Sequence, residues 1–510
     1  MTHPYQCITI CKPDADNQSN WILFGACGPH IVTQSSSGAV SVWPPKKEKV
    51  SVNDQETELQ EPPSKKVKLL ETAEELPNVT KLAVSRDNQH LVAATAEDKS
   101  IRVFHINRTG HLELLNQRPM PKRPCAVIFS PDNSTILCAD KFGDVYALPL
   151  LVSPDESEAV PPLGQKKDET SQKPFKPAAT SLTVHSGRNR KVLEDQMKQS
   201  KQQPKTKEPM RFKHEILLGH VSMLTDILFA TINAQDPTAK ARNYLLTADR
   251  DEHIRISRGP PQSHIIEGFC QGHKEFVSKL CLTKPRILIS GGGDDYLFVW
   301  DWLNCSLLEK ISIKEPVLDF FKEHPQHDKR PEDHQQEFKV AVCGLWAIPT
   351  ETSKKNEGLL VACEGIPALF YFQMGREPNA SKLCHTIPLL GNPLDLALLR
   401  LPSNEYLIFL SIDHVHEPGS TTAVRLEADI PSRLQIFSVN TNGDVKSACQ
   451  LDDGLQWFSR QAPTSGTGEA EVEDRGDIKV GAQRVVKDEK IIRDMLYGVE
   501  NLRKRAEAEE

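Results

Sequence analysis

The sequence contains no CxxC pair of cysteines, no apolar run long enough to cross a bilayer, and no signal peptide at its start. A transmembrane helix needs about 20 consecutive apolar residues, and a signal peptide needs a basic region followed by an apolar core. The 12 cysteines are scattered, and several lie in apolar runs where a reduced cysteine acts as a small hydrophobic side chain. These absences exclude a secreted disulfide framework, and we expect a soluble intracellular protein.

Aromatic residues are also scarce, at 6% of the 510 residues, whereas prolines number 36. This combination indicates many loops. The hydrophobic share of 38% is still enough for a sizeable core, and the net charge of −7 does not by itself indicate a partner.

Residues 218–300 carry two tandem copies of one pattern. Each copy opens with a Gly-His pair and closes on a strand, and the second copy ends in Trp-Asp at residues 300–301. Matching positions in the two closing strands, such as Thr247 and Ser290, are 43 residues apart. A Gly-His opening and a Trp-Asp close at this period are the signature of a WD40 propeller blade.

Weaker copies of the pattern lie on both sides of the tandem pair. They are short apolar strands joined by Asp, Gly and Ser turns, which is typical of a meander. They fall at residues 21–43, 91–104, 125–146, 340–372 and 393–439. Seven blades close a ring, so we predict an all-β, seven-bladed WD40 β-propeller over residues 1–457. Either residues 6–10 or a C-terminal strand would complete the final blade.

Three segments lack the strand pattern. Residues 44–77 and 153–210 have the charged or polar composition of disordered insertions. Residues 458–510 begin as an acidic linker and then carry apolar residues on one helical face, which predicts a short C-terminal helix docked on the propeller or on a partner. These apolar residues are Ile491, Ile492, Met495, Val499 and Leu502.

Polar residues recur at blade positions where WD repeats hydrogen-bond a His to an Asp of a turn. A catalytic triad uses the same residue types, but it would not be duplicated in successive repeats. We therefore interpret these residues as structural ties: His220, Thr247 and Asp251 in the first copy, and His273, Ser290, Asp294 and Trp300 in the second.

Other residues that could suggest a ligand site have simpler explanations. The three glycines at 291–293 precede a strand and not the helix that a phosphate loop requires, so we interpret them as a repeat turn. His and acidic residues cluster at 323–337 and 413–417, but without the fixed spacing of zinc ligands on ordered elements. We predict no metal site.

Two basic segments lie in the predicted insertions. Lys65, Lys66 and Lys68 follow a Pro-Pro pair and predict a nuclear import signal, the alternative being a solubilising charge run. Residues 165–213 contain 13 Lys and Arg against 5 Asp and Glu. That charge suits loose attraction to phosphate backbones, although a flexible loop without a partner has the same composition.

Arg250 and Arg255 are the candidate partner-binding residues. Ile254 and Ile256 are expected to face inward on their strand, so Arg255 should point the other way, while Arg250 lies in the preceding turn. Guanidinium groups near a propeller rim can pair specifically with carboxylates of a partner. An Arg at this strand position is also common in WD repeats, which leaves a purely structural role open.

Residues 139–146, 218–226, 246–257 and 272–278 resemble the non-catalytic WD-repeat subunit of the eukaryotic tRNA (guanine-N7)-methyltransferase. The resemblance implies a propeller that binds and stabilises a separate catalytic subunit. That subunit would hold S-adenosylmethionine and modify the variable-loop guanine of tRNA, and this chain would hold no cofactor. In that family a basic residue at the position of Arg255 meets an acidic surface of the catalytic subunit, so the resemblance implies a contact by Arg255, with Arg250 beside it.

The residues themselves agree with a binding role, because none of their constellations supplies a nucleophile, a general base or a nucleotide loop. We expect a non-catalytic nuclear scaffold in a heterodimer, with tRNA bound through the complex and no membrane attachment. The alternative is a nuclear WD40 adaptor of another complex, such as a ubiquitin-ligase substrate receptor.

Overall fold

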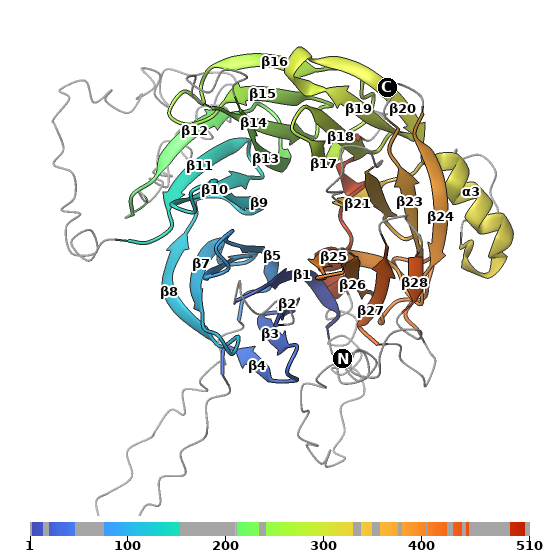
Figure 1. Ribbon diagram of the computed structural model, residues 1–510, viewed down its shortest axis with the longest axis horizontal. Helices are drawn as coiled ribbons and strands as arrows, with labels where there is room; N and C mark the ends of the chain where they lie inside the picture. The colour runs from blue at the N-terminus through green and yellow to red at the C-terminus, as the bar shows by residue number, and fades with distance from the viewer. Residues whose placement is uncertain are drawn as a thin grey trace, which may run out of the picture.

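The structure is a computed structural model that describes residues 3–13, 20–45, 76–152, 210, 212–233, 241–329, 338–348, 357–375, 380–403, 405–425, 432–440, 445–447 and 490–504. Seven antiparallel four-stranded sheets are arranged in a ring (Figure 1). The predicted all-β, seven-bladed propeller is therefore confirmed. The predicted import signal at Lys65, Lys66 and Lys68 and most of both predicted insertions lie outside the described residues.

Each blade consists of four strands that are consecutive in the chain and pair in that order. The first three blades are β1 (Tyr5–Cys11), β2 (Ile22–Cys27), β3 (His30–Ser35) and β4 (Val40–Trp43) in blade 1; β5 (Val79–Val84), β6 (His90–Thr95), β7 (Ser100–Ile106) and β8 (Leu112–Pro119) in blade 2; β9 (Pro124–Phe129), β10 (Thr135–Asp140), β11 (Asp144–Pro149) and β12 (Glu215–Gly219) in blade 3. The other four are β13 (Leu224–Ile232), β14 (Arg242–Asp249), β15 (Ile254–Arg258) and β16 (Ile266–Cys270) in blade 4; β17 (Val277–Lys284), β18 (Ile287–Gly292), β19 (Tyr296–Asp301) and β20 (Ser306–Ser312) in blade 5; β21 (Val342–Ile348), β22 (Gly358–Cys363), β23 (Ala368–Gln373) and β24 (Lys382–Pro388) in blade 6; β25 (Pro393–Arg400), β26 (Tyr406–Ile412), β27 (Leu434–Val439) and β28 (Val445–Ser447) in blade 7.

The first strand of each blade lies at the centre of the ring and contacts the first strands of its two neighbours (Figure 1). Because successive strands are antiparallel, the turn between the second and third strands lies at the same end as the connection to the next blade. We call the surface formed by these turns and connections the top face.

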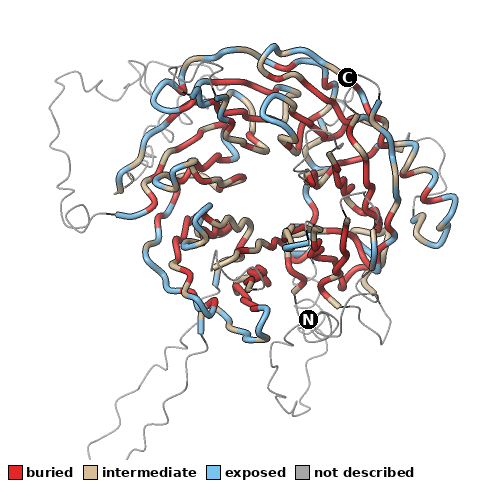
Figure 2. The backbone as a smooth tube through the Cα atoms, viewed as in Figure 1, coloured by how far each residue is buried: buried red, intermediate tan, exposed pale blue. Residues whose placement is uncertain are grey.

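Blades pack against each other through both surfaces of their sheets, so the middle strands are buried on both sides. Every residue of β2 and of β22 is buried, and Figure 2 shows buried backbone through the blade interiors with exposed residues on the outer strands. The apolar clusters join adjacent blades; Ile256 of blade 4 and Trp300 of blade 5 belong to one of them. Such double-sided burial requires near-continuous apolar strands, which the sequence supplies.

The ring closes between blades 1 and 7 by packing and hydrogen bonds. The backbone N–H of Ile8 donates to the Asp395 carboxylate at 2.9 Å, Ser411 Oγ donates to the Tyr5 carbonyl, and the rings of Trp21 and Phe409 are 5.0 Å apart. The strand at residues 6–10 belongs to blade 1. A C-terminal strand, β28, completes blade 7, which settles the alternative that the sequence left open.

Helical elements are few in the part of the chain that the structure describes. Helix α3 (Lys314–Glu323) connects blades 5 and 6 and buries Val317, Phe320 and Phe321; η1 (Trp302–Asn304) and η2 (Pro325–His327) are single turns. None of the described helices is long and apolar enough to cross a membrane.

Residues 490–504, which we call the C-terminal strap, are helical over 490–496 and at η4 (Glu500–Leu502). The strap docks on the top face of the propeller, one of the two predicted alternatives. Ile492 and Tyr497 are buried. The prediction that Ile491 shares the buried side is wrong, since its side chain is 43% exposed.

Candidate partner-binding face

The blade 5 residues interpreted as ties form one buried chain of hydrogen bonds. His273 lies 2.7 Å from Asp294 Oδ2 through Nδ1 and 2.7 Å from Ser290 Oγ through Nε2. The Trp300 indole N–H donates to the same hydroxyl at 2.8 Å. The chain joins the connection that enters blade 5 to β18, β19 and the turn between them, so these residues hold the blade together.

Blade 4 has a corresponding chain of hydrogen bonds around His220, but a different Asp accepts from the ring. His220 Nε2 lies 2.8 Å from Thr247 Oγ1, and its Nδ1 lies 3.1 Å from Asp249 Oδ2. The prediction of Asp251 as the partner is therefore wrong. The other oxygen of Asp249 accepts the N–H groups of Asp251 and His253 at 2.9 and 3.0 Å, so this carboxylate caps its own turn from inside and leaves Asp251 at the tip.

The described histidines of the two His-rich segments contact neighbouring side chains within the fold. His416 Nδ1 lies 2.6 Å from Asp413 Oδ2 in a buried pair, and the rings of His324 and Phe320 pack at 4.8 Å. Across the described ranges, which omit residues 330–337, no group of three or more His, Cys, Asp or Glu side chains could hold a metal ion.

Arg255 is buried between blades 3 and 4. Its Nε donates to Ser257 Oγ at 2.9 Å and its Nη1 donates to the Gly219 carbonyl at 3.0 Å. The side chain points away from Ile254 and Ile256 as expected, but in a propeller the opposite surface of a blade faces the next blade, and only 8% of Arg255 is exposed. Burial lowers its pKa. The structure thus places Arg255 beneath the connection that carries His220.

Arg250 lies on the top face, in the β14–β15 turn. Its backbone N–H donates to the Met223 carbonyl at 2.9 Å, which joins this turn to the connection from blade 3. Its side chain is not open to solvent on all sides, because Nε donates to the Leu502 carbonyl of the C-terminal strap at 2.8 Å. Arg250 and Arg255 therefore support the same connection from two directions.

Two large apolar side chains lie exposed on the top face, where blade 3 meets the connection to blade 4. Phe142, in the β10–β11 turn, is 62% exposed, and Val221, in the connection from blade 3 to blade 4, is fully exposed. The two segments touch, since the His220 N–H donates to the Gly143 carbonyl at 2.8 Å. Gly143 has φ +102°, and a Cβ there would overlap the His220 carbonyl oxygen, so the close approach requires glycine.

Basic residues lie beside this apolar pair. Lys122 Nζ lies 3.7 Å from the centroid of the Phe142 ring. Lys141 precedes Phe142, and the backbone N–H of Lys141 donates to the Arg123 carbonyl at 3.1 Å. We call Phe142, Val221, Lys122, Arg123 and Lys141 the Phe142–Val221 patch. Sequence reasoning missed it, although a large apolar residue inside an otherwise polar turn was a readable signal.

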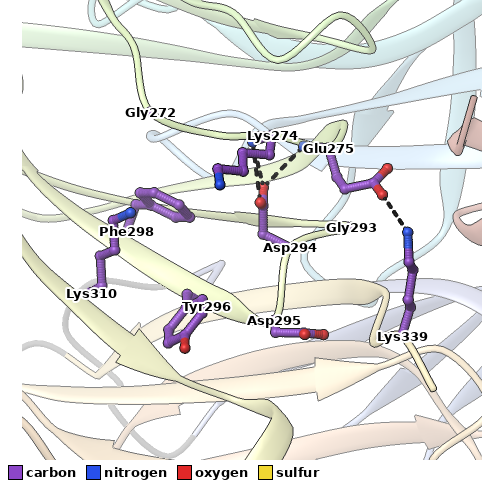
Figure 3. Close-up of a pocket in the computed structure, with 10 residues that line it drawn as sticks. All are labelled: Gly272, Lys274, Glu275, Gly293, Asp294, Asp295, Tyr296, Phe298, Lys310 and Lys339. Atoms are coloured by element: carbon purple, nitrogen blue, oxygen red, sulfur yellow. Dashed lines mark hydrogen bonds and ion pairs between the residues drawn. The ribbon is translucent and has the colours of Figure 1, made fainter. Parts of the chain in front are cut away.

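A shallow pocket of about 280 Å³ lies on the top face of blade 5 (Figure 3). Glu275 pairs with Lys339 at 2.9 Å on one wall, and Lys310 Nζ lies 4.9 Å from the centroid of the Phe298 ring on another. Asp294 points into this region while accepting the Lys274 N–H at 3.1 Å. The Asp294 and Glu275 carboxylates at this pocket therefore already have partners within the protein.

Comparison with known proteins identifies the family. The sequence model of the family described as "tRNA methyltransferase TRM82 WD40 domain" matches residues 23–437. The chain belongs to the TRM82 family. A TRM82 protein of Phaeosphaeria nodorum, named tRNA (guanine-N(7)-)-methyltransferase non-catalytic subunit, is 44% identical over 512 residues and covers 100% of both chains. A protein of the same name from Coccidioides immitis is 41% identical and covers 93% of this chain and 88% of its own length.

Among solved structures, the WD40 repeats of RRP9 match with a TM-score of 0.49 and 14% identity, covering 85% of this chain and 94% of that one. The TRM82 family match spans all seven blades from β2 to β27. The full-length relative from Phaeosphaeria nodorum also covers the C-terminal strap.

Proposed function

We propose that this TRM82-family chain is the scaffold of a heterodimer. It binds and stabilises the catalytic subunit of a tRNA (guanine-N7)-methyltransferase, which forms N7-methylguanosine in the variable loop of tRNA. S-adenosylmethionine would be held by that subunit and not by this chain. The names of the full-length relatives support this assignment.

The proposed docking site for the catalytic subunit is the Phe142–Val221 patch, and this patch is the observation on which the proposal depends. Exposed apolar side chains grouped on one surface mark interaction sites, and a protruding aromatic side chain is a frequent hot spot of binding free energy. The flanking Lys122, Arg123 and Lys141 would favour a partner with an acidic rim around an apolar hollow, because complementary charge speeds encounter and fixes orientation.

Arg255 acts in this proposal as a positioning residue. It binds the Gly219 carbonyl directly before His220, and the connection it supports carries Val221. The contact of a basic residue with the catalytic subunit is assigned instead to the cations of the Phe142–Val221 patch, of which Lys141 is exposed and Lys122 and Arg123 are half-buried. Nuclear localisation, through Lys65, Lys66 and Lys68, is a further part of the proposal.

The test is binding of the purified catalytic subunit to Phe142→Asp and Val221→Asp chains. The matched control is Leu383→Asp, which changes a residue of similar type that is 38% exposed on the outer strand of blade 6. Loss of one hot spot of about 2 kcal/mol corresponds to about 30-fold weaker binding. We expect that loss for the patch variants and unchanged binding for the control. Equal affinity for all three chains would remove the patch from the interface.

A further inference from the structure

The C-terminal strap crosses the top face over four consecutive blades, from blade 7 back to blade 4. In Figure 1 its red segments lie across the ring close to β17, β21 and β25. The strap contacts the β26–β27, β22–β23, β18–β19 and β14–β15 turns in that order. The proposed binding of a catalytic subunit uses none of these contacts directly.

At blade 7 the strap is anchored by a buried tyrosine. Tyr497 Oη donates to Asp413 Oδ2 and accepts from Asn392 Nδ2 at 3.0 Å. Asp413 and Asn392 are both fully buried, and His416 binds the same carboxylate oxygen. Ile492 adds a buried apolar contact one turn earlier. This end of the strap is therefore buried in the top face.

At blade 6 a single carboxylate holds the strap backbone. Glu364, in the β22–β23 turn, accepts the N–H groups of Gly498, Val499 and Glu500 at 3.1, 2.8 and 3.2 Å. Three charge-assisted hydrogen bonds to one side chain fix the direction in which the chain crosses this blade.

At blade 5 an arginine of the strap reaches three segments of the propeller. Arg503 Nη1 donates to the Gly293 carbonyl at 3.0 Å and lies 3.1 Å from Glu275 Oε1. Its Nη2 donates to the Val340 carbonyl at 3.3 Å, and its guanidinium lies 5.5 Å from the centroid of the Phe276 ring. Arg503 thus joins the pocket wall of blade 5 to the connection that enters blade 6.

At blade 4 the strap ends on the turn next to the Phe142–Val221 patch. The Leu502 carbonyl accepts from Arg250, and Lys504 Nζ lies 2.9 Å from Glu252 and 3.3 Å from Asp251. Arg250 is in turn bonded to Met223, two residues after Val221. A continuous set of contacts therefore links the strap to the patch.

We propose that the C-terminal strap clamps the top face of blades 4 to 7 and, through Arg250, holds the Phe142–Val221 patch in its binding shape. Each blade has only its own four strands, so among the described residues no strand is shared between neighbouring blades. The strap supplies connections across blades that the sheets lack. Because the strap is anchored at four blades, a partner would have to break several contacts to displace it. The part of the proposal that concerns docking rests on the proposed function.

The test uses the full-length chain carrying Tyr497→Ala and Arg503→Ala together, with Arg493→Ala, an exposed strap residue, as the matched control. Hydrogen exchange of the chain alone is measured first. We expect at least about tenfold faster exchange in the top-face turns of blades 4 to 7 and no change in blades 1 and 2, because local opening depends on local contacts. Unchanged exchange in those turns would overturn the clamp.

Binding of the catalytic subunit is measured next with the same variants. We expect about tenfold weaker binding to the double variant. A chain that ends at residue 489 should bind as weakly, and added peptide of residues 488–506 should restore its binding. Tighter binding without the strap would show that it occludes the patch and would overturn the proposal. Failure of the wild-type chain to bind the subunit would instead refute the proposed function and leave the exchange result standing.

Discussion

Asp249, and not Asp251, lies 3.1 Å from the His220 ring that ties the blade 3 connection to blade 4. In blade 5 the corresponding Asp294 lies four residues after Ser290, whereas Asp249 lies two residues after Thr247. The two blades reach the same hydrogen bond from different turn positions. The carboxylate in blade 4 therefore serves both the connection and its own turn.

This difference predicts unequal effects of two neighbouring substitutions. Asp249→Ala leaves His220 and two turn N–H groups without their acceptor and should lower the free energy of unfolding by about 2–3 kcal/mol. Asp251→Ala removes a partly exposed carboxylate that pairs with Lys504 and should change it by less than about 0.5 kcal/mol. Urea denaturation of both variants measures the difference, and equal losses would contradict the hydrogen-bond assignment.

Arg255→Glu is expected to act through the fold. The substitution would bury a carboxylate against the Gly219 carbonyl and leave two hydrogen bonds unmade, a loss of about 3–5 kcal/mol for an uncompensated buried charge. Any weaker assembly of this variant should therefore come with a lower melting temperature. Full stability combined with weak assembly would show instead that Arg255 contacts the catalytic subunit directly.

Gly143→Ala tests whether the geometry of the Phe142–Val221 patch matters. A methyl group at φ +102° would meet the carbonyl oxygens of His220 and Ser222, so the blade 3 connection must move. We expect a loss of about 1–3 kcal/mol in stability and weaker binding of the catalytic subunit. Gly498→Ala, where a methyl group meets no atom within 4 Å, is the matched control. Unchanged binding by Gly143→Ala would show that the position of Val221 is not critical.

The strap anchor at Asp413 should weaken in acid. Burial by itself raises the pKa of Asp413, but hydrogen bonds from His416 and Tyr497 outweigh it, and the pKa lies below its ordinary 3.8. A lowered pKa in the folded state means that the stability is present above the ordinary pKa and lost as the pH falls through the folded value. The stability difference between wild type and Asp413→Asn should therefore be constant near neutral pH and shrink below about pH 4. A difference that grows in acid would contradict the assigned anchor.

The repeat period predicted the architecture because each blade repeats the same burial of short apolar strands. The blade 5 ties among His273, Ser290 and Asp294 were predicted from the Gly-His opening and the closing strand of the repeat, and the structure confirms them. Asp251 was wrongly predicted as the partner of His220 because turn geometry, and not the repeat period, decides which carboxylate faces inward. The burial of Arg255 was missed for a related reason: strand alternation says which surface a side chain uses, but not that a neighbouring blade covers that surface. Contacts of the strap join residues up to 253 positions apart, and no local pattern encodes them.

The most direct test of the account is the rate of N7-methylguanosine formation in tRNA by the purified catalytic subunit, alone and with this chain. We predict that the wild-type chain and Leu383→Asp raise the rate. Phe142→Asp and Val221→Asp should fail to raise it under conditions where both variants remain folded. A catalytic subunit that is equally active without this chain, or fully activated by both patch variants, would contradict the account.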